Sequence, residues 1–236
     1  MIYFFLSPSK TMKLQHCHEI HSHPRFEAEA QQFRQYFRGL TEDELQKQLK
    51  ISAKQAELVA HYYQTTQAFA AIDLYQGSVF QQLQPEAYTQ EQRDYLQNHV
   101  MILSALYGCV RPFDGIQPYR LDLKQSLPIL EQSLTSFWQE RCLFEDGQPV
   151  MVNLASSEFA KLLPKTAITI DFVESYTNGK PKRLATYAKI ARGQFLHQCI
   201  HEGVRTPAEL KLLTTQRYHY SDVHSTAQHF VYLATT

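Results

Sequence analysis

The chain has 236 residues, 44% of them hydrophobic and 19% charged, with 23 lysines and arginines against 23 aspartates and glutamates. This is ordinary globular composition, and its balanced charge neither requires nor excludes a polyanionic partner, so a nucleic-acid site would need a local basic patch. No apolar run approaches the ~18–20 residues of a membrane span. No CxxC pair supports a zinc-ribbon or thioredoxin-like protein. We therefore expect a cytoplasmic monomer with free thiols and no membrane contact.

The N-terminal half is expected to start with a buried strand and to continue with helices. An apolar run over 2–6, ended by Ser-Pro, predicts the strand. Thr41 followed by Glu44 forms a capping box, and Ser52 can cap the next helix. The expected helices cover 25–37, 41–49, 52–66 and 89–98, and a central strand covers 100–106.

The C-terminal half mixes strands with helices. Asn178-Gly179 is a strong hairpin signal, and Pro128 suits the first turn of a helix. The expected strands cover 150–154, 167–176, 183–186 and 230–233, and the expected helices cover 128–144, 156–162, 187–201 and 206–213. The pattern predicts an α/β (mixed α+β) fold in a single domain over 1–236, with a mixed sheet flanked by helices and a helical subregion near residues 25–70.

Residues 7–11, Ser-Pro-Ser-Lys-Thr, follow the first strand. Loops at the carboxyl ends of strands are where α/β sheets bind ligands. The hydroxyls of Ser7 and Ser9, the backbone amides and Lys10 suit an oxyanion such as phosphate. The loop lacks the glycines of a P-loop. An ordinary turn with a surface lysine is the alternative.

Residues 103–121 form the longest polar block, in which a strand enters a loop rich in glycine and proline. Arg111 and Arg120 suit bidentate phosphate contacts, and Tyr119 can stack on a base. Asp114 is a candidate acid, although it could instead hold an arginine by an ion pair.

Residues 152–159 form a strand-to-helix junction. Ser156 can cap the helix or help to bind an anion at its N-terminus, and Glu158 favours its first turn. Capping leaves Asn153 unexplained.

Residues 185–193 open another helix, and the preceding segment 180–183 makes this the most basic stretch of the chain. Lys189 and Arg192 are three residues apart and share one helical face, with Tyr187 close by. The alternative is a solvated charged face.

Taken in order, these blocks resemble the YaaA family of peroxide-stress proteins. The motifs are S-P-S-K-T, then L-S-A-L-Y-G-x-x-R-P-x-D-x-x-x-P-Y-R-L, V-N-L-A-S-x-E-F and Y-A-K-x-A-R-G. Their order and spacing match from residue 1 to about residue 205, and the match is looser over 217–222. The resemblance implies protection against hydrogen peroxide, linked to low free iron and intact DNA. It also implies double-stranded DNA as a partner, bound through a basic cleft and a helix-hairpin-helix element.

Residues 48–59 are the segment that fits a helix-hairpin-helix. Ile51, Ala56 and Val59 are in register with the motif, but Lys50 and Ser52 replace its glycines. A lysine does not readily adopt the positive φ of the tight turn. Lys50 and Lys54 would supply charge, and the alternative is a plain helical hairpin.

Other constellations favour neither a metal nor a cofactor. The His/Cys-rich tract over 16–23 resembles a metal-binding tract but lies outside the family motifs, so a solvated loop is favoured. Cys109 is expected to be a buried small hydrophobe, with a peroxide-sensing thiol as the alternative.

Two functions remain for these blocks. The first is a non-catalytic protein that binds DNA without sequence preference. The second is an enzyme acting on a nucleotide or damaged base, with Lys10, Asp114 and Glu158 as the candidate catalytic groups.

Overall fold

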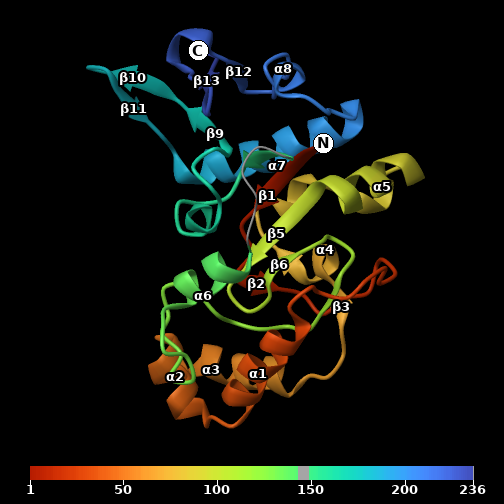
Figure 1. Cartoon of the computed structure of the whole chain (residues 1–236), viewed down its shortest axis with the longest axis vertical. Coiled ribbons are helices and arrows are strands. Elements are labelled where there is room, and N and C mark those ends of the chain that lie inside the picture. The colour runs from red at the N-terminus through yellow and green to blue at the C-terminus, as the bar shows by residue number, and fades with distance from the viewer. Residues whose placement is uncertain (143–148, 236) are drawn as a thin grey trace.

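A seven-stranded mixed sheet runs through the part of the chain that the computed structural model describes, residues 1–142 and 149–235 (Figure 1). Its order is β12-β13-β9-β8-β1-β5-β6. The strands are β1 (Ile2–Leu6), β5 (Val100–Ser104), β6 (Gly108–Val110), β8 (Val150–Asn153), β9 (Ile168–Val173), β12 (Tyr218–Tyr220) and β13 (His229–Ala234). The inner strands pair in parallel, and β6 and β12 join the edges antiparallel.

The first strand lies inside the sheet because it is apolar on both faces. In β1 only Tyr3 is partly exposed, as expected of a parallel strand covered on both sides. It pairs with β5 on one side and with β8 on the other. The chain leaves β1 for β5 and returns later to β8, so the direction of the connections reverses at β1. Such a switch point opens a crevice at the carboxyl ends of the strands.

Helices cover the sheet and form a separate cluster at one end of the molecule. Helices α1, α2 and α3 gather away from the C-terminus, which confirms the expected helical subregion (Figure 1). The helices are α1 (Glu27–Arg38), α2 (Glu42–Leu49), α3 (Ala53–Gln64), α4 (Ala71–Leu74), α5 (Gln90–His99), α6 (Leu134–Arg141), α7 (Ala185–Glu202) and α8 (Pro207–Leu210). Short 3-10 turns are η1 (Phe80–Gln82), η2 (Pro85–Ala87), η3 (Phe159–Leu162) and η4 (Asp222–His224).

The predicted cap at Thr41 is confirmed. The Thr41 side chain accepts from the Glu44 amide, and the Glu44 carboxylate accepts from the Thr41 amide at 2.8 Å. Ser52 makes the same reciprocal pair with Gln55 at the start of α3. Local hydrogen bonds of this kind fix the starts of α2 and α3. The sheet and its helices make up a single α/β domain.

Several predicted boundaries were wrong. The strand expected over 167–176 ends at Val173 in β9, and the helices expected over 156–162 and 206–213 are the shorter η3 and α8. Helix α6 starts at Leu134 rather than at residue 128, because Ser133 caps it by accepting from the Ser136 amide at 3.1 Å. Its predicted end at 144 lies outside the described residues. The strand expected over 183–186 is instead β11 (Lys180–Lys182), paired with β10 (Ser175–Thr177). Asn178 and Gly179 both have positive φ, so a two-residue turn places Thr177 directly opposite Lys180.

Residues 67–88 carried no sequence prediction and fold into short elements. Strand β4 (Tyr75–Gln76) pairs with β2 (Thr11–Met12), and β3 (Phe69–Ala70) pairs with β7 (Gly115–Ile116). The β2–β4 pairing places the segment after β4 beside the loop that follows β1.

Candidate functional site

A cavity of about 380 Å³ lies at the carboxyl ends of β1 and β8. Its walls come from residues 7–11, 76–80 and 119–122, from the loop after β8, and from α7. It therefore brings together parts of all four sequence motifs, at the switch point of the sheet. Among the residues proposed from the sequence, those that line it are Ser7, Ser9, Lys10, Tyr119, Arg120, Ser156, Glu158, Lys189 and Arg192.

Two serines tie the first and third motifs together. The Ser7 hydroxyl donates to the Ser156 hydroxyl at 3.1 Å and accepts from the Ser156 amide at 2.8 Å. Ser9 donates to the Gln76 carbonyl and accepts from the Thr11 amide at 3.2 Å. These hydroxyls hold the loops in place around the cavity.

A carboxylate organises two of the cations. The Lys10 ammonium lies 2.6 Å from Asp122, and an Arg120 nitrogen lies 3.8 Å from the same oxygen. The Asp122 side chain is buried, whereas that of Lys10 is more than half exposed. Asp122 therefore offsets part of the charge on this wall and fixes the Lys10 position.

Helix α7 contributes two cations that form no ion pair, although Asp171 acts electrostatically on one of them, Arg192. Lys189 and Arg192 form no ion pair with any residue in the described ranges. The Arg192 Nε and the Glu158 Oε1 are buried without a hydrogen-bond partner there. Burial lowers the pKa of the Arg192 guanidinium. Such unpaired buried groups are rare in folded proteins and call for an explanation.

Two glycines let the segment that contains 77–80 pack closely on two sides, against the loop after β1 and against α7. A Cβ on Gly77 would lie 2.9 Å from the Ser9 hydroxyl. A Cβ on Gly193 would lie 2.8 Å from the Gln82 Cβ and closer still to the Val79 carbonyl. Glycine permits these approaches because it has no side chain.

Tyr119 closes the cavity from inside. Its hydroxyl is bonded to Tyr75 at 2.8 Å and to Ser104 at 2.7 Å. Ser104 in turn accepts from the amides of Leu106 and Tyr107. The ring of Tyr119 is thus held rigidly, and burial raises the pKa of its hydroxyl.

A second hollow of about 220 Å³ adjoins the cavity on the side of the helical cluster. Lys10, Thr11 and Arg120 line both spaces, and the far end of the hollow is formed by Ile51 and Gln55. A concave surface therefore extends from the α2–α3 connection to α7.

Several proposed residues lie outside the cavity. Arg111 is exposed and is not among its lining residues. Asn153 shapes the turn after β8: its Oδ1 accepts from the Ala155 amide at 2.9 Å, and its Nδ2 donates to Thr169. Tyr187 lies under the Arg217 guanidinium, 4.6 Å from the ring centre. Lys50 and Lys54 are exposed on the α2–α3 hairpin.

Asp114 is a buried structural carboxylate, away from the cavity. It accepts from the Arg111 amide at 2.7 Å and from the Ser22 hydroxyl. Burial raises the pKa of this carboxyl, against the lowering effect of those hydrogen bonds.

We expect Asp114→Ala to lower stability by about 1–3 kcal/mol, because the partly buried Arg111 amide and Ser22 hydroxyl lose their acceptor. Urea unfolding measures the change. A variant as stable as the wild type would show that these hydrogen bonds do not contribute to stability.

The described cysteines are all free, and Cys17 alone is exposed. Burial raises the pKa of the Cys109 thiol well above its ordinary value. Because the thiolate is the reactive form, we expect iodoacetamide to label Cys17 in the native protein and Cys109 only after unfolding. Peptide mass spectrometry identifies the labelled cysteines. Rapid labelling of Cys109 in the native protein would support the alternative that it is a peroxide-sensing thiol.

The His/Cys-rich tract is docked rather than freely solvated. Asp73 accepts from the amides of Cys17 and His18 and lies 2.6 Å from the His18 Nδ1. His16 stacks on Phe69. Within residues 1–142 and 149–235, no group of three or more His, Cys, Asp or Glu side chains is placed to hold a metal ion.

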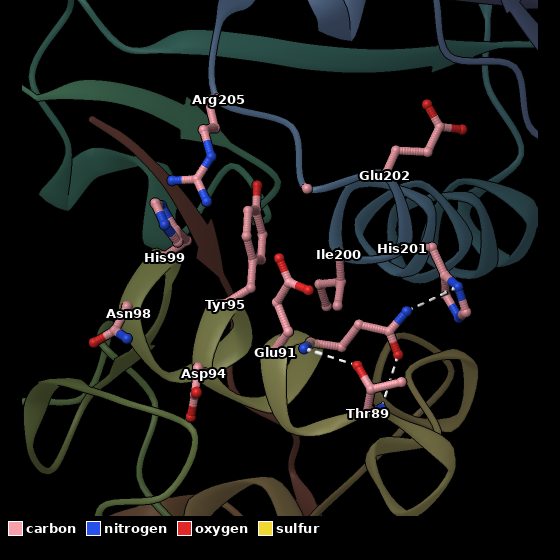
Figure 2. A pocket seen from close by; sticks show the side chains of 12 residues that line it. Thr89, Glu91, Asp94, Tyr95, Asn98, His99, Ile200, His201, Glu202 and Arg205 are labelled. Atoms are coloured by element: carbon pink, nitrogen blue, oxygen red, sulfur yellow. Dashed lines mark hydrogen bonds between the residues drawn. The ribbon is translucent and has the colours of Figure 1, made fainter.

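A larger cavity, about 520 Å³, lies near the amino ends of β1 and β5. Figure 2 shows side chains from α5 facing those from the end of α7 and the loop after it. His99 bonds the Ile2 carbonyl at the start of β1, and Gln92 bonds His201. Its lining mixes acids with Arg205 and contains none of the four motifs. Because this cavity shares no lining residue with the cavity formed by the motifs, substitutions in it can serve as controls.

Sequence reasoning missed one wall of the cavity and one of its carboxylates. The wall is the segment 76–80, and the carboxylate is Asp122. Gly77-Ser78 indicates a loop, and Asp122 lies two residues after Arg120. Neither feature indicates that these residues line the same cavity as the motifs.

None of the helices in the described ranges combines the length and apolarity of a bilayer span.

Comparison with known proteins agrees with the motif pattern. Residues 2–224 match the family described as peroxide stress protein YaaA. The chain is 32% identical to a UPF0246 protein of Lactobacillus johnsonii, over 98% of this chain and 97% of that protein. It is also 32% identical to one of Lacticaseibacillus casei, over 98% and 99%. With a family match over nearly its whole length, the chain belongs to the peroxide stress protein YaaA family.

Proposed function

We propose that this peroxide-stress protein acts in the cytoplasm as a monomer that binds double-stranded DNA without sequence preference. The observation that carries the proposal is the pair Lys189 and Arg192, which face the cavity without carboxylate partners in the described ranges. Phosphate oxygens are the natural partners of such cations.

The concave surface supports contact with a backbone longer than one phosphate. It continues past Lys10 and Arg120 to the α2–α3 hairpin, where Lys50 and Lys54 are exposed. Cations spaced along one surface can follow successive phosphates.

The hairpin itself supports a helix-hairpin-helix role. Lys50 adopts φ 55°, the left-handed conformation that the motif ordinarily assigns to glycine. The turn thus forms despite the missing glycines, and Ala56 and Val59 are buried as the motif requires. We propose that the turn amides and Lys50 contact one phosphate while α7 contacts another.

Fluorescence anisotropy with a labelled duplex at several salt concentrations tests the proposal. We expect micromolar or weaker affinity, a steep salt dependence and little difference between unrelated sequences. Absence of binding at low salt would contradict it. Lys50→Ala/Lys54→Ala should weaken binding, whereas Lys47→Ala/Lys124→Ala, which removes the same charge from residues outside the cavity and the turn, should have a smaller effect.

We propose further that bound protein limits iron-driven oxidation of DNA. Plasmid nicking by ferrous iron and peroxide should fall as the protein saturates the DNA. Equal protection by a variant that does not bind DNA would show that the effect is not due to coverage.

A second candidate function is an enzyme that acts on a nucleotide or damaged base. It is favoured by the Glu158 carboxylate, whose Oε1 is buried and unpaired beside the cations of the cavity. Glu158 would act as acid or base, with Lys10 as the accompanying electrophile or nucleophile. Mass spectrometry of a panel of nucleosides and oxidised oligonucleotides tests it, and an unchanged panel would exclude it.

A further inference from the structure

The cavity holds two unpaired groups of opposite charge that do not satisfy each other. Arg192 and Glu158 both line it, yet no ion pair joins them in the described part of the chain. Each keeps a buried polar atom without a partner. Buried polar atoms of this kind are costly unless a partner completes them. Because both side chains also line the cavity, a ligand with an anionic group and a hydrogen-bond donor would complement them.

The cavity volume limits the size of that ligand. At about 380 Å³ it is at the lower end of the ~300–1,000 Å³ typical of small-molecule sites. A DNA duplex cannot enter such a space, so duplex contacts are restricted to its rim. Glu158 lines the cavity, so only a molecule that fits inside can contact its carboxylate there.

The cationic wall suits a terminal phosphate. Lys189 supplies a mobile ammonium from an exposed position on α7, and Arg192 supplies a half-buried guanidinium one turn further on. Four cations line the cavity against two carboxylates, Asp122 and Glu158. Asp122 is already paired with Lys10, so an arriving dianion meets at α7 two cations that form no ion pair in the described ranges, of which Arg192 is partly offset by the more distant Asp171.

The Glu158 carboxylate would determine which chemical group the ligand carries at the end away from its phosphate. A carboxylate only accepts hydrogen bonds, and its two oxygens suit two neighbouring donors. Among the nucleobases, guanine presents such a pair, its ring N1–H and its 2-amino group. Thymine presents one N–H between two carbonyls, which a carboxylate repels. Glu158 therefore favours guanine over thymine.

Aromatic side chains supply the surface between these ends. Tyr119, Phe80 and Phe159 all line the cavity. The Tyr119 hydroxyl is already bonded to Tyr75 and Ser104, which holds its ring in position. All three rings are almost fully buried, so they give the ligand an apolar wall rather than an exposed face for stacking.

We propose that the cavity is a binding site for a single guanine nucleotide, with its phosphate on Lys189 and Arg192 and its base edge on Glu158. The site rests on the proposed function only in assigning a phosphate to α7. It adds a small-molecule ligand that does not require duplex DNA.

Isothermal titration with GMP, TMP and inorganic phosphate tests the site on the wild-type protein. We expect GMP to bind at least about tenfold more tightly than TMP, because a bidentate base contact discriminates by that order. Phosphate alone should bind weakest. Equal affinity for GMP and TMP would overturn the base assignment, and GMP binding no tighter than phosphate would overturn the site.

Glu158→Gln should reduce GMP affinity about tenfold, because the amide offers one acceptor and places a donor against guanine. It should not weaken phosphate binding, because the change removes a negative charge from the cavity. Glu91→Gln is the matched control, since Glu91 lines the other cavity (Figure 2). Unchanged GMP affinity in the folded Glu158→Gln protein would overturn the proposal, and circular dichroism verifies the fold.

The DNA proposal and the nucleotide proposal fail in different ways. Lys50→Ala/Lys54→Ala should weaken duplex binding and leave GMP affinity unchanged, because neither lysine lines the cavity. If the wild-type protein binds GMP but no duplex, only the DNA-binding proposal is refuted. If it binds duplex but no GMP, only the nucleotide-site proposal is refuted.

Discussion

Lys189→Ala/Arg192→Ala should weaken duplex DNA binding by about 10- to 100-fold and reduce the salt dependence by about two phosphate contacts. Both cations face the cavity without carboxylate partners in the described ranges, so their charge is available to a phosphate. Anisotropy titrations at several salt concentrations give both the affinity and the slope.

The control for this variant removes the same charge elsewhere. Arg111 and Lys165 are exposed and lie outside the cavity lining, so Arg111→Ala/Lys165→Ala changes the net charge by the same amount. We expect it to reduce affinity only slightly, because exposed charges beyond a Debye length of about 8–10 Å are screened. Equal losses in the two variants would show that net charge, rather than the α7 pair, binds DNA.

Gly193→Ala should destabilise the protein by about 1–3 kcal/mol, although alanine is normally the better helix former by about 1 kcal/mol. An added Cβ would lie 2.8 Å from the Gln82 Cβ and would also collide with the Val79 carbonyl. Helix α7 must then move away from η1, and the segment 77–80 loses its support. Urea unfolding measures the stability, and GMP titration reports the damage to the cavity.

Gly39→Ala is the matched control for this change. Gly39 ends α1 in right-handed helical conformation, and a Cβ there would find its nearest neighbour at an ordinary 3.5 Å. We expect a change within about 0.5 kcal/mol, as at other surface sites. If Gly193→Ala were as stable as the wild type, the close α7–η1 contact would not limit packing.

Elements with a strong local cause were predictable. The apolar run of β1 could only be a buried strand. Thr41 with Glu44, and Ser52 ahead of α3, set helix starts through bonds that span three residues. Asn178-Gly179 fixed a turn, although the strand after it was misplaced by three residues because the tightness of the turn was underestimated.

The site was only partly predictable, because membership in it depends on which loops meet. Arg111 and Arg120 lie in the same motif, and the sequence suggests the same phosphate-binding role for both. In the structure Arg120 lines the cavity and Arg111 does not. Asn153 and Asp114 carry the chemistry of functional residues but satisfy backbone amides instead. Such roles follow from contacts between distant segments.

The sequence by itself determined the family, the positions of most core strands, the helix caps and the motifs that contain most of the cavity lining. Only the tertiary structure decided that β1 lies between β5 and β8, which brings those motifs to one crevice. It also decided that a segment with no motif, 76–80, completes the wall, since Gly193 lets α7 approach it. The physical reason is that capping and periodicity act over a few residues, whereas the unpaired Arg192 and Glu158 result from packing across the whole chain.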